Sequence, residues 1–246
     1  MTRELTLILN ADDLGYDPAV TRGILQSMRA GVVTSTTLLV NTPYSAEAAE
    51  AARDLPVGLH LNLARFPPVW PNFPRQLLND GGLDERRAST LPAEVVAAEA
   101  TAQLERCEQL LRKRPTHADV HKHLHRHPSV LEGLKQAAKR YGLPVRSIDA
   151  PMRAALKRDG VPTNDHFVGD AGSTAYWTLE RFAQAVAMLS PGVTELMCHP
   201  GYTPSHVQSG YAAQREVELA TLTDRRAGEL LDRCGAQLAN FSDLRS

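Results

Sequence analysis

The sequence predicts an α/β fold: a closed or nearly closed barrel of about seven β/α units that forms a single domain over residues 1–246. Three observations support this. Short apolar segments alternate with helix-like segments along the chain, which is typical of a parallel sheet with crossover helices. About seven such units occur with no linker between two halves, which favours a closed or nearly closed barrel. Polar side chains gather just after the predicted strands, as at the functional rim of such barrels. A doubly wound open sheet remains the alternative.

The first two units of the chain are regular. Residues 5–10 form an apolar run that predicts a buried strand, and residues 18–30 predict a helix because Pro18 suits a first helical turn. Residues 32–40 are rich in β-branched side chains and residues 44–53 in Ala and Glu, which indicates a second strand and a second helix.

The third predicted strand, at residues 57–63, leads into a long irregular segment. Residues 65–90 contain several prolines and a pair of glycines, so they cannot form one regular element. Long loops inside compact domains tend to be functional. The same criteria predict a helix at residues 92–114, a strand at residues 116–121 and a helix at residues 128–141.

The last part of the chain predicts two further strand and helix units and a final strand. A second irregular segment separates them from the first part. These elements are a strand at 143–148, the irregular segment at 149–174, a helix at 179–189, a strand at 193–197, a loop to residue 211, a helix at 212–234 and a strand at 236–238.

Composition and charge exclude several classes of function. The chain has 27 Lys and Arg against 28 Asp and Glu, so it lacks the positive charge that drives binding to nucleic acid or to an anionic membrane. We expect a small substrate, no nucleic acid and no membrane as partners, and the sequence leaves a homodimer open. The apolar run near the start is too short for a secretion signal, so we expect a cytoplasmic protein. Three distant cysteines suggest neither disulfides nor a thiolate zinc site.

The polar residues after the predicted strands are the strongest functional signal, because the strands are placed by their pattern before any chemistry is considered. In a parallel barrel these positions lie on one rim. They are Asn10, Asp12 and Asp13 after the first strand, Asn41 after the second, His60 and Asn62 after the third, Asp119 and His121 after the fourth, Arg146 and Asp149 after the fifth, and His199 after the sixth.

The adjacent carboxylates Asp12 and Asp13 suit a metal centre. Neighbouring residues of an extended strand point to opposite sides, so one could bind a metal while the other faces water or substrate if the strand end is twisted. An acidic helix cap before Pro18 is the structural alternative. A carboxylate with two neutral imidazoles is a common ligand set for a catalytic divalent ion with open positions. His60 supplies one imidazole by its location, although a lone buried histidine is more often a core residue.

The segment from residue 116 to residue 127 holds five of the nine histidines. If it stays extended, its alternate residues share one face and reach one site. We expect His121 to be a direct ligand, with Asp119 and His123 or His125 orienting ligands or contacting substrate. A surface histidine tract with incidental metal affinity is the alternative.

Two further residues could take part in chemistry. His199 follows the strand at 193–197 and could be a general acid that protonates a leaving amine, or simply a histidine of a turn. Arg146 could pair with Asp12 and set its orientation, or could form an inconsequential surface ion pair. Aromatic residues of the irregular segments are candidates for stacking on a sugar ring. They are Trp70, Tyr176, Trp177 and Tyr202.

Five ordered motifs resemble those of the YdjC-like carbohydrate deacetylases, the group that includes the ChbG and HpnK proteins. The resemblance extends from residue 5 to about residue 240. The motifs are Asn10-Ala-Asp-Asp-Leu-Gly15, Thr34-Ser-Thr-Thr-Leu-Leu-Val-Asn41, Gly58-Leu-His-Leu-Asn-Leu63, Thr116-His-Ala-Asp-Val-His-Lys-His-Leu-His125 and Glu195-Leu-Met-Cys-His-Pro-Gly201.

The resemblance implies a seven-stranded, TIM-like (deformed) β/α barrel and removal of an N-acetyl group from an amino sugar or chitooligosaccharide. It implies that Asp13, His60 and His121 bind one metal ion and that Asp12 is the general base. The chain departs from the family pattern at Leu14 and Val120, which lie outside these ligands. It also departs at residues 64–68, in the loop expected to contact sugar, and this leaves the identity of the sugar open.

We therefore expect a metal-dependent hydrolase that uses Asp12 and His199 in catalysis, with Asn41, Asp119, His123, His125 and Arg146 supporting the metal or contacting the carbohydrate. The ligand set suits Mg²⁺ or Zn²⁺, and it also accepts Mn²⁺ or Co²⁺. A metal-dependent phosphoesterase or cyclic-amide hydrolase would use the same ligands but needs more basic residues in the site. A non-enzymatic metal-binding or sugar-binding module is the alternative of a different class.

Overall fold

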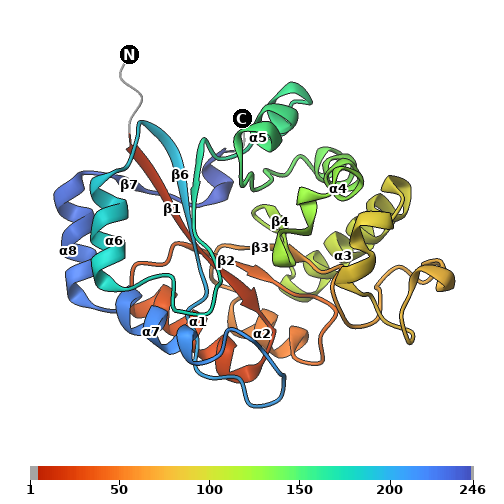
Figure 1. Cartoon of the computed structure of the whole chain (residues 1–246), viewed down its shortest axis with the longest axis horizontal. Helices are drawn as coiled ribbons and strands as arrows, with labels where there is room; N and C mark the ends of the chain where they lie inside the picture. The colour runs from red at the N-terminus through yellow and green to blue at the C-terminus, as the bar shows by residue number, and fades with distance from the viewer. Residues whose placement is uncertain (1–4, 245–246) are drawn as a thin grey trace.

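The computed structural model describes residues 5–244, and the remaining residues of the predicted 1–246 domain lie outside this range. Strands and helices alternate along most of the chain (Figure 1). The strands are β1 (Leu5–Leu14), β2 (Ser35–Leu38), β3 (Val57–Leu61), β4 (Ala118–Val120), β5 (His166–Val168), β6 (Gly192–Cys198) and β7 (Gln237–Leu238). The helices are α1 (Pro18–Ala30), α2 (Ser45–Ala51), α3 (Ala93–Leu111), α4 (Pro128–Tyr141), α5 (Ala150–Arg158), α6 (Leu179–Ala187), α7 (Ala213–Leu222) and α8 (Arg225–Cys234).

All strand pairs of the seven-stranded sheet are parallel, as the alternation of elements predicts. Six strands follow the order β4-β3-β2-β1-β6-β5, and β7 pairs with the start of β1. Among residues 5–244, β4 and β5 stand at the two ends of this order, so the sheet is a curled half-barrel with a seventh strand rather than a closed ring. The predicted seven-stranded, deformed α/β barrel is confirmed in this form.

Helices pack around the outside of the curled sheet (Figure 1). α3 and α4 pack against each other beside β3 and β4, whereas α6 packs on α8 and α7 on α1 at the other side. From Leu7 to Leu14 every residue of β1 is buried, because β1 lies in the middle of the sheet and both of its faces are covered.

Local sequence signals set several helix ends. The Asp17 side chain accepts a hydrogen bond from the Ala19 backbone N–H at 2.7 Å, so α1 begins where Pro18 predicts. Asp224 accepts from the Arg226 N–H at 2.8 Å and starts α8. The single helix predicted at residues 212–234 is therefore wrong, because this new cap divides it into α7 and α8.

The strand predicted at residues 143–148 is also wrong. Only Val145 bridges to Ala118, and Pro144 has no N–H to extend the ladder. The fifth strand lies instead at His166–Val168, inside the segment predicted to be irregular, and that segment also contains α5. No helix within residues 5–244 is long and apolar enough to cross a membrane.

The proline-rich loop after β3 is held by a buried acid of α3. Glu99 is fully buried and accepts hydrogen bonds from the backbone N–H groups of Val69 at 2.9 Å and Trp70 at 2.8 Å. Burial raises the pKa of Glu99, although these hydrogen bonds oppose the shift. The loop therefore has a defined path despite lacking regular structure.

Replacing Glu99 by Ala should lower the free energy of unfolding by about 1–3 kcal/mol, because two backbone donors lose their acceptor. Urea unfolding at neutral pH measures the change. Glu94 lies on the same helix and is exposed, so E94A is the matched control and should change the free energy of unfolding by about 0.5 kcal/mol or less. Equal effects of the two variants would contradict the anchoring role of Glu99.

Candidate functional site

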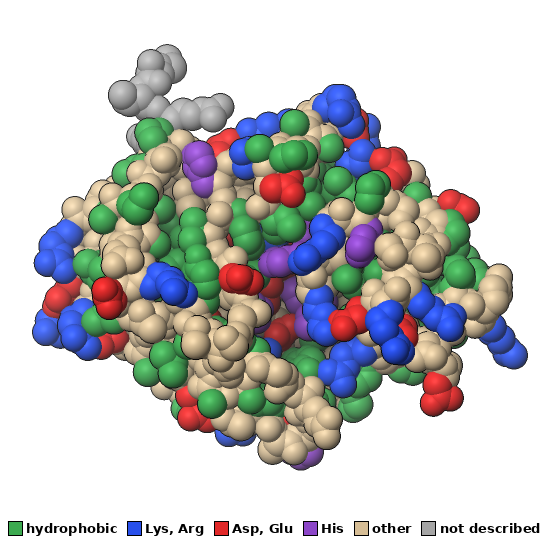
Figure 2. Space-filling model, viewed as in Figure 1, with side chains coloured by type: hydrophobic (Ala, Val, Ile, Leu, Met, Phe, Trp, Pro, Cys, Tyr) green, Lys and Arg blue, Asp and Glu red, His purple; other side chains and the backbone are tan. Residues whose placement is uncertain are grey.

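A cavity of about 580 Å³ opens at the carboxyl ends of the central strands, a size typical of small-molecule sites. Figure 2 shows the face on which it opens, with His, acidic and basic side chains gathered in a hollow near the middle. Six of the predicted site residues line it, namely Asp12, Asp13, His60, His121, His123 and His199. Further lining residues include Tyr16, Arg65, Lys122, Arg126, Asp170, Tyr211 and Arg215.

An irregularity of β1 brings both adjacent carboxylates to this cavity. The pairing of β1 with β2 shifts register between Ala11 and Leu14, and Asp13 adopts a left-handed backbone conformation with φ of 75°. Such a conformation is uncommon outside Gly but is tolerated best by Asp and Asn. Because of this bulge, Asp12 and Asp13 do not point to opposite faces as they would on a regular strand.

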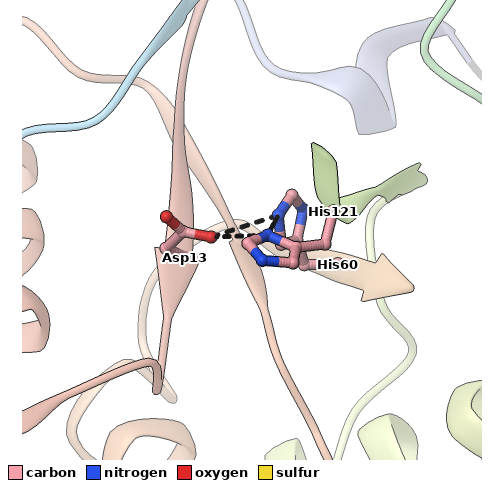
Figure 3. A group of neighbouring side chains, drawn as sticks. All are labelled: Asp13, His60 and His121. Carbon is pink, nitrogen blue, oxygen red and sulfur yellow. Dashed lines mark hydrogen bonds and ion pairs between the residues drawn. The ribbon is translucent and has the colours of Figure 1, made fainter. Parts of the chain in front are cut away.

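Asp13, His60 and His121 come from three different strand ends and point toward one another (Figure 3). Asp13 Oδ1 lies 3.3 Å from His60 Nε2 and 3.0 Å from His121 Nδ1, and the two ring nitrogens are 3.1 Å apart. All three residues are buried. One oxygen and two nitrogens therefore converge on a single point.

The three donor atoms fit a divalent cation. At metal–ligand distances of about 2.1 Å, ligand atoms lie about 3.0 Å apart at right angles and about 3.4 Å apart in a tetrahedron. The observed separations fall in this range. Asp13 Oδ1 is also buried with no hydrogen-bond partner, which is costly unless something positive binds it. The donor set and its orphaned oxygen therefore suit a cation bound by N and O atoms.

Asp119 fixes the orientation of His60. Asp119 is fully buried, and its Oδ1 accepts a hydrogen bond from His60 Nδ1 at 2.6 Å, which turns Nε2 toward Asp13. Burial by itself would lower the pKa of His60, but the charge and hydrogen bond of Asp119, helped by Asp13 and Asp12, raise it to about 10. The surroundings of His60 thus favour positive charge, whether a proton or a metal ion carries it.

Arg146 is fully buried and joins three carboxylates. Its two terminal nitrogens donate to the two oxygens of Asp12 at 2.7 Å each, so the ion pair that the sequence allowed is present. Arg146 Nη1 lies 2.9 Å from Asp119 Oδ2, and Arg146 Nη2 lies 2.6 Å from Glu195 Oε1. Burial opposes ionisation of Asp12, but Arg146 outweighs it and holds the pKa of Asp12 well below its usual range. Asp12 is therefore an ionised carboxylate of fixed orientation.

His199 lines the cavity next to these groups. Its backbone N–H donates to Glu218 Oε2 at 2.6 Å, whereas its ring Nδ1 is buried with no hydrogen-bond partner. Burial lowers the pKa of His199 to about 4, although the negative charges of Asp13 and Asp12 oppose the shift. The imidazole is therefore neutral at neutral pH.

The histidine-rich segment does not stay extended. Only Ala118–Val120 forms strand β4, and a 3-10 turn follows over His121–Arg126 in which Lys122 and His123 have left-handed backbone conformations. His123 lines the cavity, whereas His125 is fully buried and does not line it. Neither ring nitrogen of His125 has a hydrogen-bond partner.

Asn41 does not line the cavity. Its side-chain amide donates to the backbone oxygen of Pro67 at 3.0 Å, and its oxygen accepts from Asn62 at 3.0 Å. Asn41 therefore holds the start of the proline-rich loop. Arg65 of the same loop lines the cavity, so Asn41 contacts the loop and not the cavity itself.

The aromatic residues singled out from the sequence do not line the cavity either. Trp177 is a core residue whose indole N–H donates to the Met197 carbonyl at 2.7 Å. Tyr16 and Tyr211 line the cavity instead. The Tyr16 hydroxyl accepts from Arg65 Nη1 at 2.7 Å, so this side chain connects the segment after β1 to the proline-rich loop.

Sequence reasoning missed three buried charged residues at the site. Arg215 of α7 binds Asp13 Oδ2 at 2.5 Å. Glu195 binds Arg146, and burial raises the pKa of Glu195 to about 7. Glu218 holds the backbone of His199. Glu195 does lie in one of the recognised motifs, whereas Arg215 and Glu218 lie in a helix whose many charges give no sign of burial.

Comparisons with known proteins agree with the motifs. A family model described as YdjC-like protein matches residues 6–233. A carbohydrate deacetylase of Geobacillus stearothermophilus is 39% identical over 248 residues, which cover 96% of each chain. A chitooligosaccharide deacetylase of Citrobacter koseri is 32% identical over 256 residues, which cover 98% of this chain and 100% of the relative.

A solved structure shares the fold along nearly the whole chain. It is a crystal structure from Enterococcus faecalis, named a candidate cellobiose-phosphate cleavage protein, with 31% identity and a TM-score of 0.87. The match covers 99% of this chain and 100% of that one. The resemblance inferred from the motifs is therefore confirmed, and the chain belongs to the YdjC-like protein family.

Proposed function

We propose that the protein is a metal-dependent hydrolase that removes N-acetyl groups from an amino sugar or chitooligosaccharide. The observation that carries the proposal is the convergence of Asp13, His60 and His121 in a cavity that Asp12 also lines. The names of the relatives, carbohydrate deacetylase and chitooligosaccharide deacetylase, support the substrate class. Two observations therefore support the proposal: the donor set suits a cation, and the relatives are named as deacetylases of carbohydrates.

Two overlapping groups of side chains could hold the cation, and the contacts of their carboxylates favour one of them. Asp12, His60 and Asp119 form an overlapping group that could also hold a metal ion. However, Arg146 already binds both Asp12 and Asp119, whereas Asp13 Oδ1 faces the two imidazoles and has no hydrogen-bond partner. We therefore assign the cation to Asp13, His60 and His121. Four buried carboxylates, those of Asp12, Asp13, Asp119 and Glu195, share the guanidinium groups of Arg146 and Arg215, so a divalent ion bound by the imidazoles would offset further negative charge.

A divalent cation bound there would lower the pKa of a water molecule and polarise the acetamide carbonyl. Asp12 is the general base of the proposal, because its carboxylate is ionised and lines the cavity. Arg146 and Asn10 donate to Asp12, but each carboxylate oxygen has two lone pairs, so Asp12 can still accept a further hydrogen bond. The low pKa of Asp12 makes it a weak base, so it requires a water of lowered pKa.

His199 is the proposed general acid. Because its pKa is about 4, His199 begins neutral and can protonate the leaving amine only after it takes up a proton within the site. The unpartnered Nδ1 gives it a free position for that transfer. His123 lines the same cavity and is the second candidate, whereas the fully buried His125 supports the wall behind it. The proposed ion is Mg²⁺ or Zn²⁺, and Mn²⁺ or Co²⁺ also accept this ligand set.

The test is to offer N-acetylated mono- and oligosaccharides to cation-loaded protein and to measure released acetate. We expect acetate from at least one of these sugars, loss of its release after chelation, and recovery when the cation is returned. A chain that releases no acetate from any sugar, with the cation bound, would contradict the proposal.

Hydrolysis of a phosphate ester is the second candidate function, and one observation favours it. Arg65, Lys122 and Arg126 line the cavity, which supplies the basic side chains that a phosphate requires. Each of them already has a partner: Arg65 binds Tyr16, Lys122 binds Glu85, and Arg126 binds backbone carbonyls. A phosphate ester belongs in the same panel, and phosphate release without acetate release would select this candidate.

A further inference from the structure

Arg215 reaches the cation site from the far end of the chain. It lies in α7 and is almost completely buried, and its NH2 donates to Asp13 Oδ2 at 2.5 Å. The other carboxylate oxygen, Oδ1, is the one that faces His60 and His121. The two oxygens of Asp13 therefore have separate roles in the structure.

Several contacts hold the guanidinium group of Arg215 in place. Its Nε donates to the Tyr211 carbonyl at 2.9 Å, and its central carbon lies 5.7 Å from the ring centre of Tyr16 and 5.9 Å from that of Tyr211. The Arg215 carbonyl accepts from the Gly201 N–H at 3.2 Å, which ties α7 to the segment after β6. Arg215 is thus a rigid donor and not a mobile surface charge.

Fixing one oxygen of a carboxylate decides how the other can bind. A free carboxylate binds a cation through one oxygen or through both. Because Arg215 holds Oδ2 and fixes the orientation of the carboxylate, Asp13 presents Oδ1 to the site, where this oxygen faces His60 and His121. A hydrolytic cation needs a coordination position that no protein atom fills. A second oxygen from Asp13 would compete for that position.

We propose that Arg215 is a positioning residue that keeps Asp13 a ligand through Oδ1 alone and thereby preserves an open position at the cation. This inference rests on the cation site of the proposed function. Lys at position 215 could bind Oδ2 or the Tyr211 carbonyl with its single nitrogen, but it could not hold both in the way that the forked guanidinium does. Neutral side chains would release Oδ2.

The test is the visible absorption spectrum of the Co²⁺-loaded protein, measured beside kcat and KM. In R215M we expect one equivalent of Co²⁺ to bind with an altered spectrum, because Oδ2 joins the ligands. We expect kcat to fall about 10–100-fold, the usual effect of losing a partner of a metal ligand, with KM little changed. R215Q serves the same test if R215M does not fold, and R215K should return the spectrum toward that of the native protein.

R106M is the matched control, because Arg106 donates to the Val40 carbonyl from α3 and does not line the cavity. It should leave the spectrum unchanged. A native spectrum in R215M, or complete loss of Co²⁺ uptake, would overturn the inference, since Arg215 would then either stabilise the fold alone or be required for the site to exist. If the native protein binds Co²⁺ but releases no acetate, the proposed function fails while the spectrum still decides the role of Arg215.

Discussion

The D12N variant should lose nearly all deacetylation, by about 10²–10⁴-fold in kcat, while it still binds the cation. Asn cannot accept a proton at neutral pH, so the water loses its base. The amide keeps the size of the carboxylate and an oxygen that can accept from Arg146, which retains its contacts with Asp119 and Glu195. Acetate release and cation titration, measured on the same preparation, separate the two effects.

Asp232 provides the control for D12N, because it is an exposed carboxylate on α8 far along the chain from the site residues. D232N should keep native turnover. Full turnover by D12N would show that Asp12 is not the base. A protein in which D12N changes no measurable property would instead be a binding module without enzymatic activity.

The H121A variant should lose cation affinity by at least about 100-fold, more than the loss of an outer partner of a ligand causes, and turnover should fall with it. His121 is the cleanest ligand to remove. Its Nδ1 lies near Asp13 and His60, whereas the ring of His60 is also bonded to Asp119, whose Oδ1 would lose this partner in H60A. Isothermal titration with Zn²⁺ or Mn²⁺ measures the affinity.

His127 lies in the same histidine-rich segment but outside the cavity, which makes H127A the matched control. H127A should bind the cation as the native protein does. If H127A and H121A lose affinity equally, the segment would be a surface tract with incidental metal affinity, and the assignment of His121 would be wrong.

The sequence predicts that Asp13, His60 and His121 lie close together, because parallel strands deliver their carboxyl ends to one edge. The three residues lie at or next to the carboxyl ends of β1, β3 and β4, so their convergence does not depend on the exact strand bounds. Asp119 is equally accessible to prediction. It lies on β4 directly across from a histidine of the neighbouring strand, since His60 and Asp119 are in register.

Other features depend on long-range packing that has no local signature. Arg215 lies in a helix where its charged neighbours, Glu216 and Glu218, give no local sign of burial, and only its approach to Asp13, 202 residues away, reveals that it is buried. Strand β5 has three residues of intermediate exposure, too short for an alternation to be recognised. The left-handed conformation of Asp13, which brings both acids to the cavity, is set by the bulge between β1 and β2.

The measurement that tests the central claim most directly is acetate release from an N-acetylated sugar while a divalent cation is titrated into metal-stripped protein. The account predicts negligible release at the start and a rise that saturates at one bound equivalent. It also predicts no comparable rise in H121A over the same range of cation. Full release by the stripped protein, or a rise in H121A that matches the native one, would contradict a cation held by Asp13, His60 and His121.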